Sequence, residues 1–471
     1  MENLKVGVGS AVITPPVGYY MASWALRKGR STGVHDHHYA KSLVLDDGEN
    51  MLAIASLDVV NCPEELTLEI RKIVQDRTGI PGENVMISCT HTHTGPILGG
   101  AREIERGRDV RGFEKYIEIF PDYVAGSIIE GYNRLVEATI GASSSHVPGV
   151  SCNRRYHEKP VDTELGVLKV EKKNGKPLAS VINFAAHELV VDGRYLFWTA
   201  DYPGYAKRLL EKVWPGSTSL FLAGAGGNVS PWDMWRGNEN CRPSTYEEAE
   251  RLGNILASEA FKTMQTIKTS SEVNLKVISE TVDLPCRKLP WSISEAEEVL
   301  EEVLNMKDPG PTWDESNGPA APEDCGGTAN QGIRYCGTYR PNAIKGIIRL
   351  IKGSYTEEKV IPTELQVFKI GDIVLAANPG ELFNELGLKI KEQSPYENTF
   401  VVSYANGTIG YIPTREAVEE ASKLSLRDIA GVDSPLVARK LYGGIPASTR
   451  MSELAGDLLV DKTLKLIKKL Q

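Results

Sequence analysis

Apolar runs broken by short turn sequences predict several β-hairpins along this chain. Residues 41–58 (KSLVLDDGENMLAIASLD) are expected to form two strands that meet at Asp47-Gly48, a dipeptide typical of tight hairpin turns. The same combination of two apolar strands around a turn dipeptide occurs in residues 165–187, at Asn174-Gly175, and in residues 365–381, at Gly371-Asp372. The pattern therefore predicts a protein with extended β-sheets.

Helical spacing of apolar residues follows the first hairpin. Leu66, Ile70 and Val74 form an apolar stripe in a segment that begins at Pro63 and ends at Gly79. A buried strand is expected next, over residues 84–89, so strand, helix and strand form a βαβ unit. Further helices are expected over 203–213, with Asp201 as the cap, over 294–306 and over 451–470.

This alternation predicts an α/β fold with mixed β-sheets and flanking helices. The 471 residues exceed the usual size of one hydrophobic core, so we expect either two lobes or one large domain with insertions. We favour a single catalytic domain over residues 1–471, without a C-terminal immunoglobulin-like domain. Residues 287–345 are rich in Pro, Gly and Asp after their helical part, which is typical of an inserted flap.

Charge and composition exclude some partners. A net charge of −9 and a pI near 5.6 argue against nucleic acid, which requires a basic surface. No apolar stretch is long enough for a transmembrane helix or a signal peptide, which predicts a cytoplasmic protein without stable membrane insertion. The seven cysteines lack a CxxC pair, and we expect them to be reduced, although Cys325 and Cys336 are close enough in sequence to pair.

Side chains that can bind a metal ion or take part in catalysis lie at the ends of four predicted strands. In the stretch SCTHTHTGP, His91 and His93 follow a buried strand, and residues two apart on an extended chain share a face. Both histidines could bind one metal ion, or one could bind while the other acts on a substrate. The other three strand ends carry His187, Ser230 and Glu381. Ligands of α/β sheets gather at such ends, so a site assembled from distant strands is expected.

Two known zinc patterns with an HxH pair do not fit. A metallo-β-lactamase would need Asp and His where Gly95 and Pro96 stand. An amidohydrolase barrel would need a bridging lysine and further strand-end histidines, of which only His187 is found in a convincing setting.

A third pattern fits. THTHTGP, NFAAHE, AGAGGNVSP, NPGE and GYIPT, in this order, resemble the motifs of the neutral/alkaline (non-lysosomal) ceramidase family. The resemblance extends over roughly residues 5–465, and the five motifs in order make it specific.

The resemblance implies a zinc-dependent amidase with one catalytic Zn²⁺. By position, the zinc ligands would be His91, His187 and Glu381, and His93 would lie beside the metal and assist the reacting amide. Two imidazoles and one carboxylate leave an open coordination position, as catalytic zinc sites require.

Three further residues correspond to family site residues. Ser230 matches a serine regarded either as a nucleophile or as a substrate-positioning hydroxyl, and Tyr411 matches a tyrosine near the scissile carbonyl. Arg154 matches an arginine near the substrate, although the adjacent Arg155 leaves the register open. The stretch after GYIPT lacks the further tyrosine that the family has about a dozen residues on, so the fourth metal ligand is left open.

The predicted function is hydrolysis of an amide C–N bond by metal-activated water. The expected substrate is a small-molecule or lipid-like amide, and the natural one could be a smaller soluble amide. Two alternatives stay open: an esterase or lactonase centred on Ser230, whose loop lacks a GxSxG elbow, and a non-catalytic metal-containing binding protein. The oligomeric state is not determined by these patterns.

Overall fold

The computed structural model describes residues 3–22, 29–98, 113–156, 158–231, 244–305, 344–348, 351–352, 359–430 and 449–471. Its main feature is a sheet of eight strands in the order β11-β9-β8-β6-β1-β3-β4-β5. The strands are β1 (Lys5–Val12), β3 (Tyr39–Asp46), β4 (Met51–Leu57), β5 (Val85–Cys89), β6 (Val136–His146), β8 (Glu164–Lys172), β9 (Pro177–Phe184) and β11 (Thr218–Ala223).

Two of the three predicted hairpins, at Asp47-Gly48 and Asn174-Gly175, are present in this sheet, and the third belongs to the second sheet described below. Strands β3 and β4 pair antiparallel, and Gly48 between them has a φ of 87°, a left-handed conformation that glycine adopts without strain. Strands β4 and β5 pair parallel, with the helix α1 (Glu64–Thr78) between them, so the predicted βαβ unit is confirmed. Because parallel strands end at the same edge, β4 and β5 deliver their following loops to one place.

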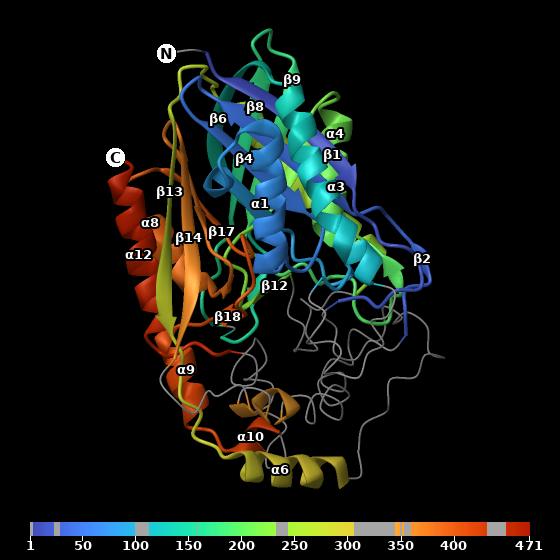
Figure 1. The fold of residues 1–471 in the computed structure, drawn as a ribbon, viewed down its shortest axis with the longest axis vertical. Helices are drawn as coiled ribbons and strands as arrows, with labels where there is room; N and C mark the ends of the chain where they lie inside the picture. The colour runs from blue at the N-terminus through green and yellow to red at the C-terminus, as the bar shows by residue number, and fades with distance from the viewer. Residues whose placement is uncertain are drawn as a thin grey trace.

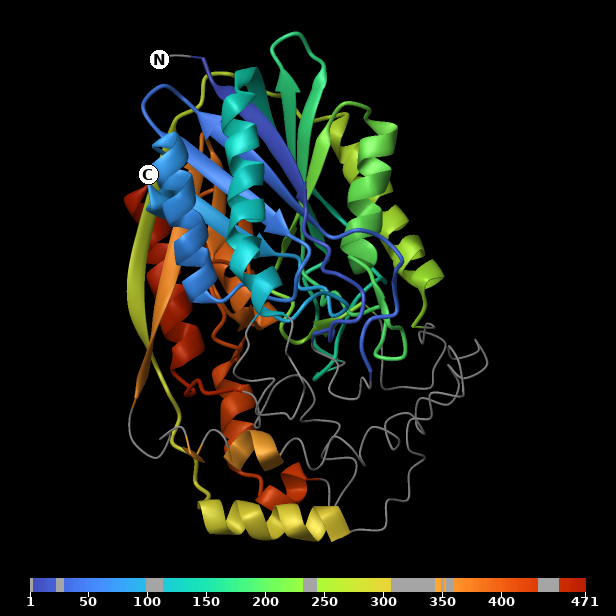
Figure 2. The same ribbon diagram turned by 45° about the vertical axis from the view of Figure 1, so that its right-hand side comes forward.

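Four helices cover one face of the large sheet. They are α1, α3 (Glu114–Asn133), α4 (Asp201–Val213) and α5 (Tyr246–Met264). Figure 1 shows α1 and α3 side by side in front of the strands, and Figure 2 shows α4 and α5, in green to yellow-green, beside the same sheet. Their apolar faces bury Ile70, Phe120, Tyr202 and Leu256 against the sheet.

Helix α3 approaches β1 so closely that glycine is required on the strand. A Cβ atom on Gly7 would lie 1.9 Å from the carbonyl oxygen of Gly131 in α3. We therefore expect Gly7→Ala to lower the free energy of unfolding by about 1–3 kcal/mol or more, because the helix must move away from the sheet. Chemical denaturation measures the change.

Gly126 gives a matched control for this substitution, since it lies in α3 and a Cβ atom there would meet nothing within 4 Å. Gly126→Ala is expected to raise stability by up to about 1 kcal/mol through helix propensity. Equal effects of the two substitutions would contradict the close-packing explanation.

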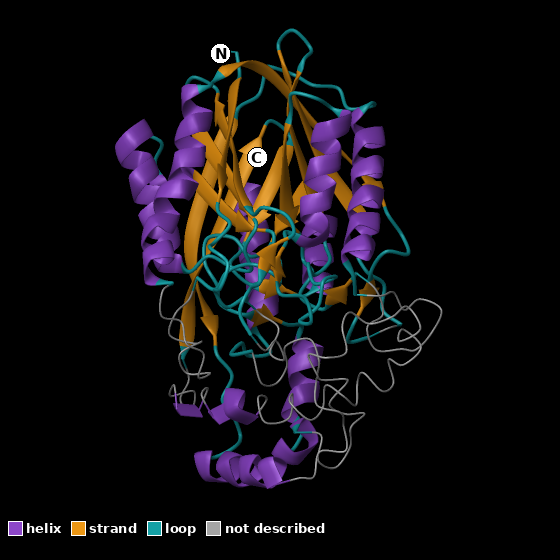
Figure 3. Cartoon of the chain, turned by 90° about the vertical axis from the view of Figure 1, so that its right-hand side faces the viewer, coloured by secondary structure: helices purple, strands orange, loops and turns teal. Residues whose placement is uncertain are grey.

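A second sheet packs on the opposite face of the large one. It contains β13 (Leu275–Pro285), β14 (Val360–Ile370), β15 (Ile373–Ala377) and β17 (Asn398–Val402). Alternate residues of β15 face opposite ways: Ile373 and Leu375 join the core between the two sheets, whereas Val374 joins the core beneath α8 (Asn384–Gln393) and α12 (Ala455–Lys469). The layers are thus helices, sheet, sheet and helices. Figure 1 shows α8 and α12 beside β13 and β14, and Figure 3 shows the strands between helices at the left and right. The predicted α/β class is confirmed.

Short ladders and helices surround the edge where the site residues gather. The two-residue strands are β2 (Gly33–Val34) with β10 (Phe197–Trp198), β7 (Cys152–Asn153) with β12 (Val229–Ser230), and β16 (Glu381–Leu382) with β18 (Tyr411–Ile412). Helices α9 (Arg415–Ser422), α10 (Leu426–Ile429) and α6 (Ile293–Asn305) follow at this end of the molecule (Figure 1). A short 3-10 helix, η1 (Gly82–Asn84), precedes β5.

Some boundary predictions need correction. Asp201 is not the cap of α4: the N-cap is Ala200, and the Asp201 carboxylate instead accepts hydrogen bonds from the backbone N–H groups of Val191 and Tyr202. The terminal helix begins at Ala455 rather than at residue 451. Of the predicted flap, α6 packs on α10 through apolar side chains, whereas residues 306–343 lie outside the described residues.

Cys62, Cys89 and Cys286 are buried free thiols. Cys325 and Cys336, which are close enough in sequence to pair, lie outside the described residues. Among the described residues, no helix is long and apolar enough to cross a membrane.

Candidate metal centre

His91 follows the end of β5 in a strained backbone conformation, which hydrogen bonds to neighbouring carbonyls hold in place. Its φ is 64°, in the left-handed region that side chains other than glycine seldom adopt, and its backbone N–H donates to the carbonyl of Val59. Its ring nitrogen Nδ1 lies 2.6 Å from the carbonyl oxygen of Val60. A carbonyl only accepts, so Nδ1 carries the proton and Nε2 presents a lone pair.

His187 is held in the same way by a different loop. Its Nδ1 lies 2.7 Å from the carbonyl oxygen of Gly226, which again leaves Nε2 as the unprotonated nitrogen. Burial, followed by the nearby charge of Arg154, lowers the pKa of His187 to about 3. The imidazole is therefore neutral at pH 7, as a metal ligand must be.

Glu381 brings a carboxylate to both of these nitrogens. Its Oε2 lies 3.6 Å from Nε2 of His91 and 3.3 Å from Nε2 of His187. Burial alone would raise the pKa of Glu381, but the contacts with His187 and His91 outweigh it and hold the pKa well below its ordinary value. The carboxylate is ionised at neutral pH.

These three groups fit a zinc ion. Ligand atoms about 2.0–2.1 Å from a tetrahedral metal lie about 3.3–3.4 Å from one another, close to the two carboxylate–imidazole distances. Two imidazole lone pairs that face one carboxylate oxygen would repel each other and the oxygen unless a cation lies between them. The donor set therefore suits a divalent metal ion with nitrogen and oxygen ligands.

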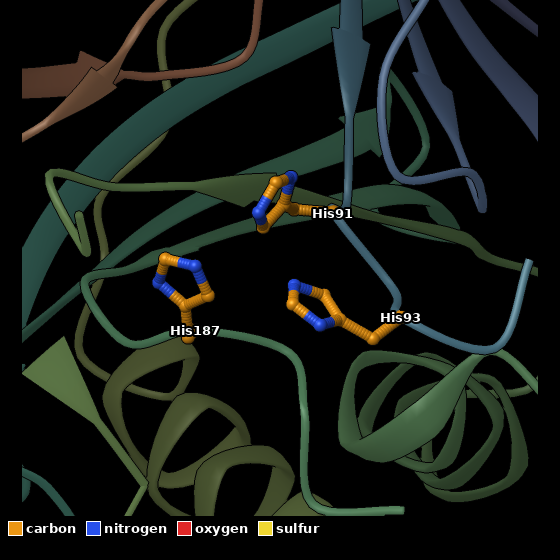
Figure 4. Close-up of side chains that lie close together, drawn as sticks. All are labelled: His91, His93 and His187. Atoms are coloured by element: carbon orange, nitrogen blue, oxygen red, sulfur yellow. The ribbon is translucent and has the colours of Figure 1, made fainter. Parts of the chain in front are cut away.

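His93 lies on the same side of the chain as His91. The candidate ligand nitrogens of His91, His93 and His187 all lie within 4.8 Å of one another, and Figure 4 shows the three rings around a shared space. Burial, then the neighbouring His91 and His187, lowers the pKa of His93 well below its ordinary value. The geometry by itself leaves His93 able to bind the ion or to stand beside it.

Arg154, rather than Arg155, points into the site. Its Nη2 donates to the Tyr411 hydroxyl at 3.1 Å and to the carbonyl of Gly227 at 2.6 Å, and it lies 3.3 Å from Nε2 of His187. Arg155 instead donates to the Glu420 carboxylate at 3.0 Å, away from the histidines. The ring of Tyr411 stacks near that of His187, with centroids 6.3 Å apart.

Ser230 is fully buried on the strand beside Arg154. Its strand β12 pairs with β7, which places Ser230 opposite Cys152, and the preceding Val229 accepts from the His187 backbone N–H. The glycines before it permit close approach: a Cβ atom on Gly227 would lie 2.4 Å from the Glu381 carbonyl oxygen. The Gly-rich loop is therefore packed against the segment that carries Glu381.

Two features of the site have no counterpart among the residues expected from the sequence. Asn228 and Asn153 both donate to the carboxylate of Glu385. These hydrogen bonds connect the β7–β12 ladder, which contains Ser230, to α8. The ring of Tyr404 stacks on that of His91, with centroids 3.8 Å apart and planes 11° apart. The sequence around Tyr404 contains no motif that predicts this contact, because His91 lies in a distant part of the chain.

Comparison with known proteins agrees with the motifs. The family model described as "Neutral/alkaline non-lysosomal ceramidase, N-terminal" matches residues 4–233, which include His91, His93, His187 and Ser230. The chain belongs to the neutral/alkaline non-lysosomal ceramidase family. The resemblance inferred from the five motifs is thus confirmed.

Curated members of the family match at low identity. Neutral ceramidase of Drosophila melanogaster is 25% identical over 466 residues, which cover 83% of this chain and 65% of that protein. Neutral ceramidase A of Dictyostelium discoideum is 24% identical over 282 residues, 54% of this chain and 39% of that protein. The chain thus matches between about two fifths and two thirds of the length of these ceramidases.

Solved ceramidase structures share the fold. A structure titled "Ceramidase complexed with C2" matches with a TM-score of 0.72 at 17% identity, and neutral ceramidase from Pseudomonas aeruginosa matches with a TM-score of 0.67 at 19% identity. Each match covers 100% of this chain and 75% of the solved chain. At these identities the matches establish the common fold.

Proposed function

We propose that this protein is a zinc-dependent hydrolase that cleaves an amide C–N bond, with His91, His187 and Glu381 as metal ligands. One observation carries the proposal: both histidines commit Nδ1–H to a backbone carbonyl and turn Nε2 toward the same carboxylate oxygen of Glu381. Metal-bound histidines typically show this second hydrogen bond. Family membership supports amide hydrolysis as the reaction.

When bound, the ion would supply a Lewis acid that activates water and polarises the substrate carbonyl. The remaining chemistry belongs to this chain's own side chains. In hydrolysis, water adds to the carbonyl carbon, the C–N bond breaks, and the leaving nitrogen gains a proton. His93 is partly buried and its lowered pKa keeps it neutral beside the site, so it would take a proton from water and return one to the leaving amine.

Arg154 and Tyr411 would stabilise the negative charge that develops on the carbonyl oxygen. The guanidinium already donates to the tyrosine hydroxyl, so both donors are held in fixed positions before a substrate arrives. Ser230 is assigned a substrate-positioning hydroxyl, and the pairing of its strand β12 with β7, which directly precedes Arg154, supports this assignment.

Substrate and cellular context are also part of this proposal. The curated relatives are named as ceramidases, so an N-acyl amide is the proposed substrate class, with a smaller soluble amide as the natural one. Residues 1–471 would act as one catalytic domain, with residues 287–345 as an insertion or flap within it. The cytoplasmic location predicted from the sequence remains a prediction.

Metal removal is the test of the proposal. The purified protein is expected to contain one zinc per chain by elemental analysis, and chelation should abolish hydrolysis of N-acyl amides until zinc is restored. A panel of amides, esters and lactones would define the bond cleaved.

Ser230→Ala separates the two hydrolytic mechanisms. Because Ser230 is assigned a positioning role, this variant is expected to keep zinc and to retain measurable, metal-dependent activity. Activity that survives chelation and His187→Ala but disappears in Ser230→Ala would overturn the metal-dependent mechanism. A zinc-containing protein inert on every class would favour a binding function.

A further inference from the structure

Tyr404 occupies an unusual position beside the candidate metal centre. Four non-glycine residues among those described have positive φ, and three of them gather here: His91 at 64°, Tyr404 at 55° and Asn406 at 62°. A bulky aromatic residue in this region is an outlier that the surrounding structure must enforce, and such residues concentrate at functional sites.

The segment around Tyr404 joins the two elements that bring His91 and Glu381 together. On one side, the Cys89 N–H donates to the Tyr404 carbonyl at 3.1 Å, and the Asn406 N–H donates to the carbonyl of Ile87 at 2.8 Å. On the other side, the Tyr404 N–H donates to the carbonyl of Gly380 at 3.3 Å. These bonds connect the end of β5 with the residue directly before Glu381.

The Tyr404 ring restrains a tilt of the His91 imidazole that the hydrogen bond to the Val60 carbonyl does not prevent. A single hydrogen bond at Nδ1 fixes one edge of the imidazole but lets the ring tilt about that contact. The phenol ring lies against the imidazole face with planes only 11° apart, and Tyr404 is itself 4% exposed. The tilt that would turn Nε2 away from Glu381 is blocked on that face.

We propose that Tyr404 is a positioning residue of the metal centre: its ring fixes the plane of the His91 imidazole and so raises the affinity for the metal ion. The inference rests on the proposed metal-dependent function. An aromatic face against an imidazole also favours the positive charge that metal binding places on that ring. The Tyr404 hydroxyl, which is buried and has no hydrogen-bond partner among the described residues, is not needed for this role.

Metal affinity measured against a chromophoric chelator tests the inference, with the spectrum of the cobalt-substituted protein as a second readout. Tyr404→Leu is expected to weaken zinc binding about 10–100-fold and to change the cobalt spectrum, because the imidazole can tilt. Tyr404→Phe keeps the ring and is expected to bind zinc as tightly as the wild type.

Two further variants separate positioning from general stability. Tyr404→Gly accepts the positive φ without strain, so it keeps the backbone while losing the ring, and it should weaken zinc binding even if Tyr404→Leu does not fold. Tyr396→Leu is the matched control, since Tyr396 packs on the outer core and bonds Leu470, away from the site. It should lower stability and leave metal affinity unchanged.

The outcomes distinguish this inference from the proposed function. If the wild type binds zinc and Tyr404→Leu and Tyr404→Gly bind it equally well, the positioning role is wrong and the metal site stands. If Tyr404→Phe loses as much affinity as Tyr404→Leu, the hydroxyl rather than the ring is responsible, which also overturns the inference. A wild-type protein that binds no divalent metal would overturn both.

Discussion

His91→Ala is expected to remove both zinc and activity, whereas His93→Ala should keep zinc and lose only rate. The expected difference in zinc content follows from the position of the Glu381 carboxylate. Glu381 Oε2 lies close to Nε2 of His91 and of His187, so in the proposed site it would complete a ligand shell with these two histidines. That shell would leave the remaining coordination position for water and substrate, and His93, beside it, would be available for proton transfer.

Magnitudes sharpen this comparison. Loss of a general acid–base group typically costs about 10²–10⁴-fold in rate, so His93→Ala should show a reduced kcat with one zinc per chain. His91→Ala should show less than one zinc per chain and activity at background. Elemental analysis of dialysed protein, combined with initial rates on an N-acyl amide, measures both quantities on the same samples.

His146→Ala is the matched control for the pair. His146 is exposed at the end of β6, and its ring Nδ1 lies 3.1 Å from the Thr163 hydroxyl. It should change neither zinc content nor rate. If His91→Ala and His93→Ala lose zinc to the same extent, the division of roles is wrong and the ion is bound by all three histidines.

The sequence could predict which strands deliver the site residues because strand ends have local signatures. Turn dipeptides such as Asp47-Gly48 mark hairpins, and the apolar run before His91 marks a buried strand. The motifs then supplied His187 and Glu381 through the family resemblance. The local pattern also correctly gave α1 and its end at Gly79, where a left-handed residue closes the helix.

Other features depend on contacts between distant segments and have no local signature. Periodicity could not separate Arg154 from Arg155, because both lie in a bend after the two-residue strand β7, where no regular alternation indicates which side chain faces the site. The structure separates them: Arg154 contacts His187 and Tyr411, whereas Arg155 contacts Glu420. Likewise, the expected cap Asp201 bonds a loop ten residues upstream, since a buried carboxylate can accept several backbone donors.

The packing of the two sheets against each other could not be predicted from local sequence patterns either. Strands buried on both faces are often continuously apolar, so the sequence of β15 predicts a core strand without indicating what covers each of its faces. The structure places the second sheet on one face of the large sheet and helices on the other. Glu381 comes from the second sheet's side and His91 from the first, so the site lies where the two sheets meet.

A buried ion pair beneath the site should prove a major contributor to folding stability. Lys207 of α4 and Asp58, which follows β4, are both at most 2% exposed, and their charged atoms lie 2.5 Å apart. The Asp58 carboxylate also accepts from the Tyr39 backbone N–H at 3.0 Å. Removal of one partner from a buried pair typically costs about 3–5 kcal/mol, because the other charge is left without compensation. We therefore expect Lys207→Met to lower the free energy of unfolding by this amount.

A double-mutant cycle isolates the pair. Asp58→Asn keeps an acceptor for Tyr39, and the double variant Asp58→Asn/Lys207→Met has lost both charges of the pair, so it should be more stable than the sum of the single effects predicts. The exposed pair Lys262–Glu259, with Lys262 77% exposed, is the control: Lys262→Met should change stability by less than about 1 kcal/mol. Val59 and Val60, the two residues after Asp58, accept hydrogen bonds from the backbone and the ring of His91. Lys207→Met should therefore also weaken zinc binding. Additive effects in the cycle, or a loss in Lys207→Met no larger than in Lys262→Met, would show that the pair contributes little.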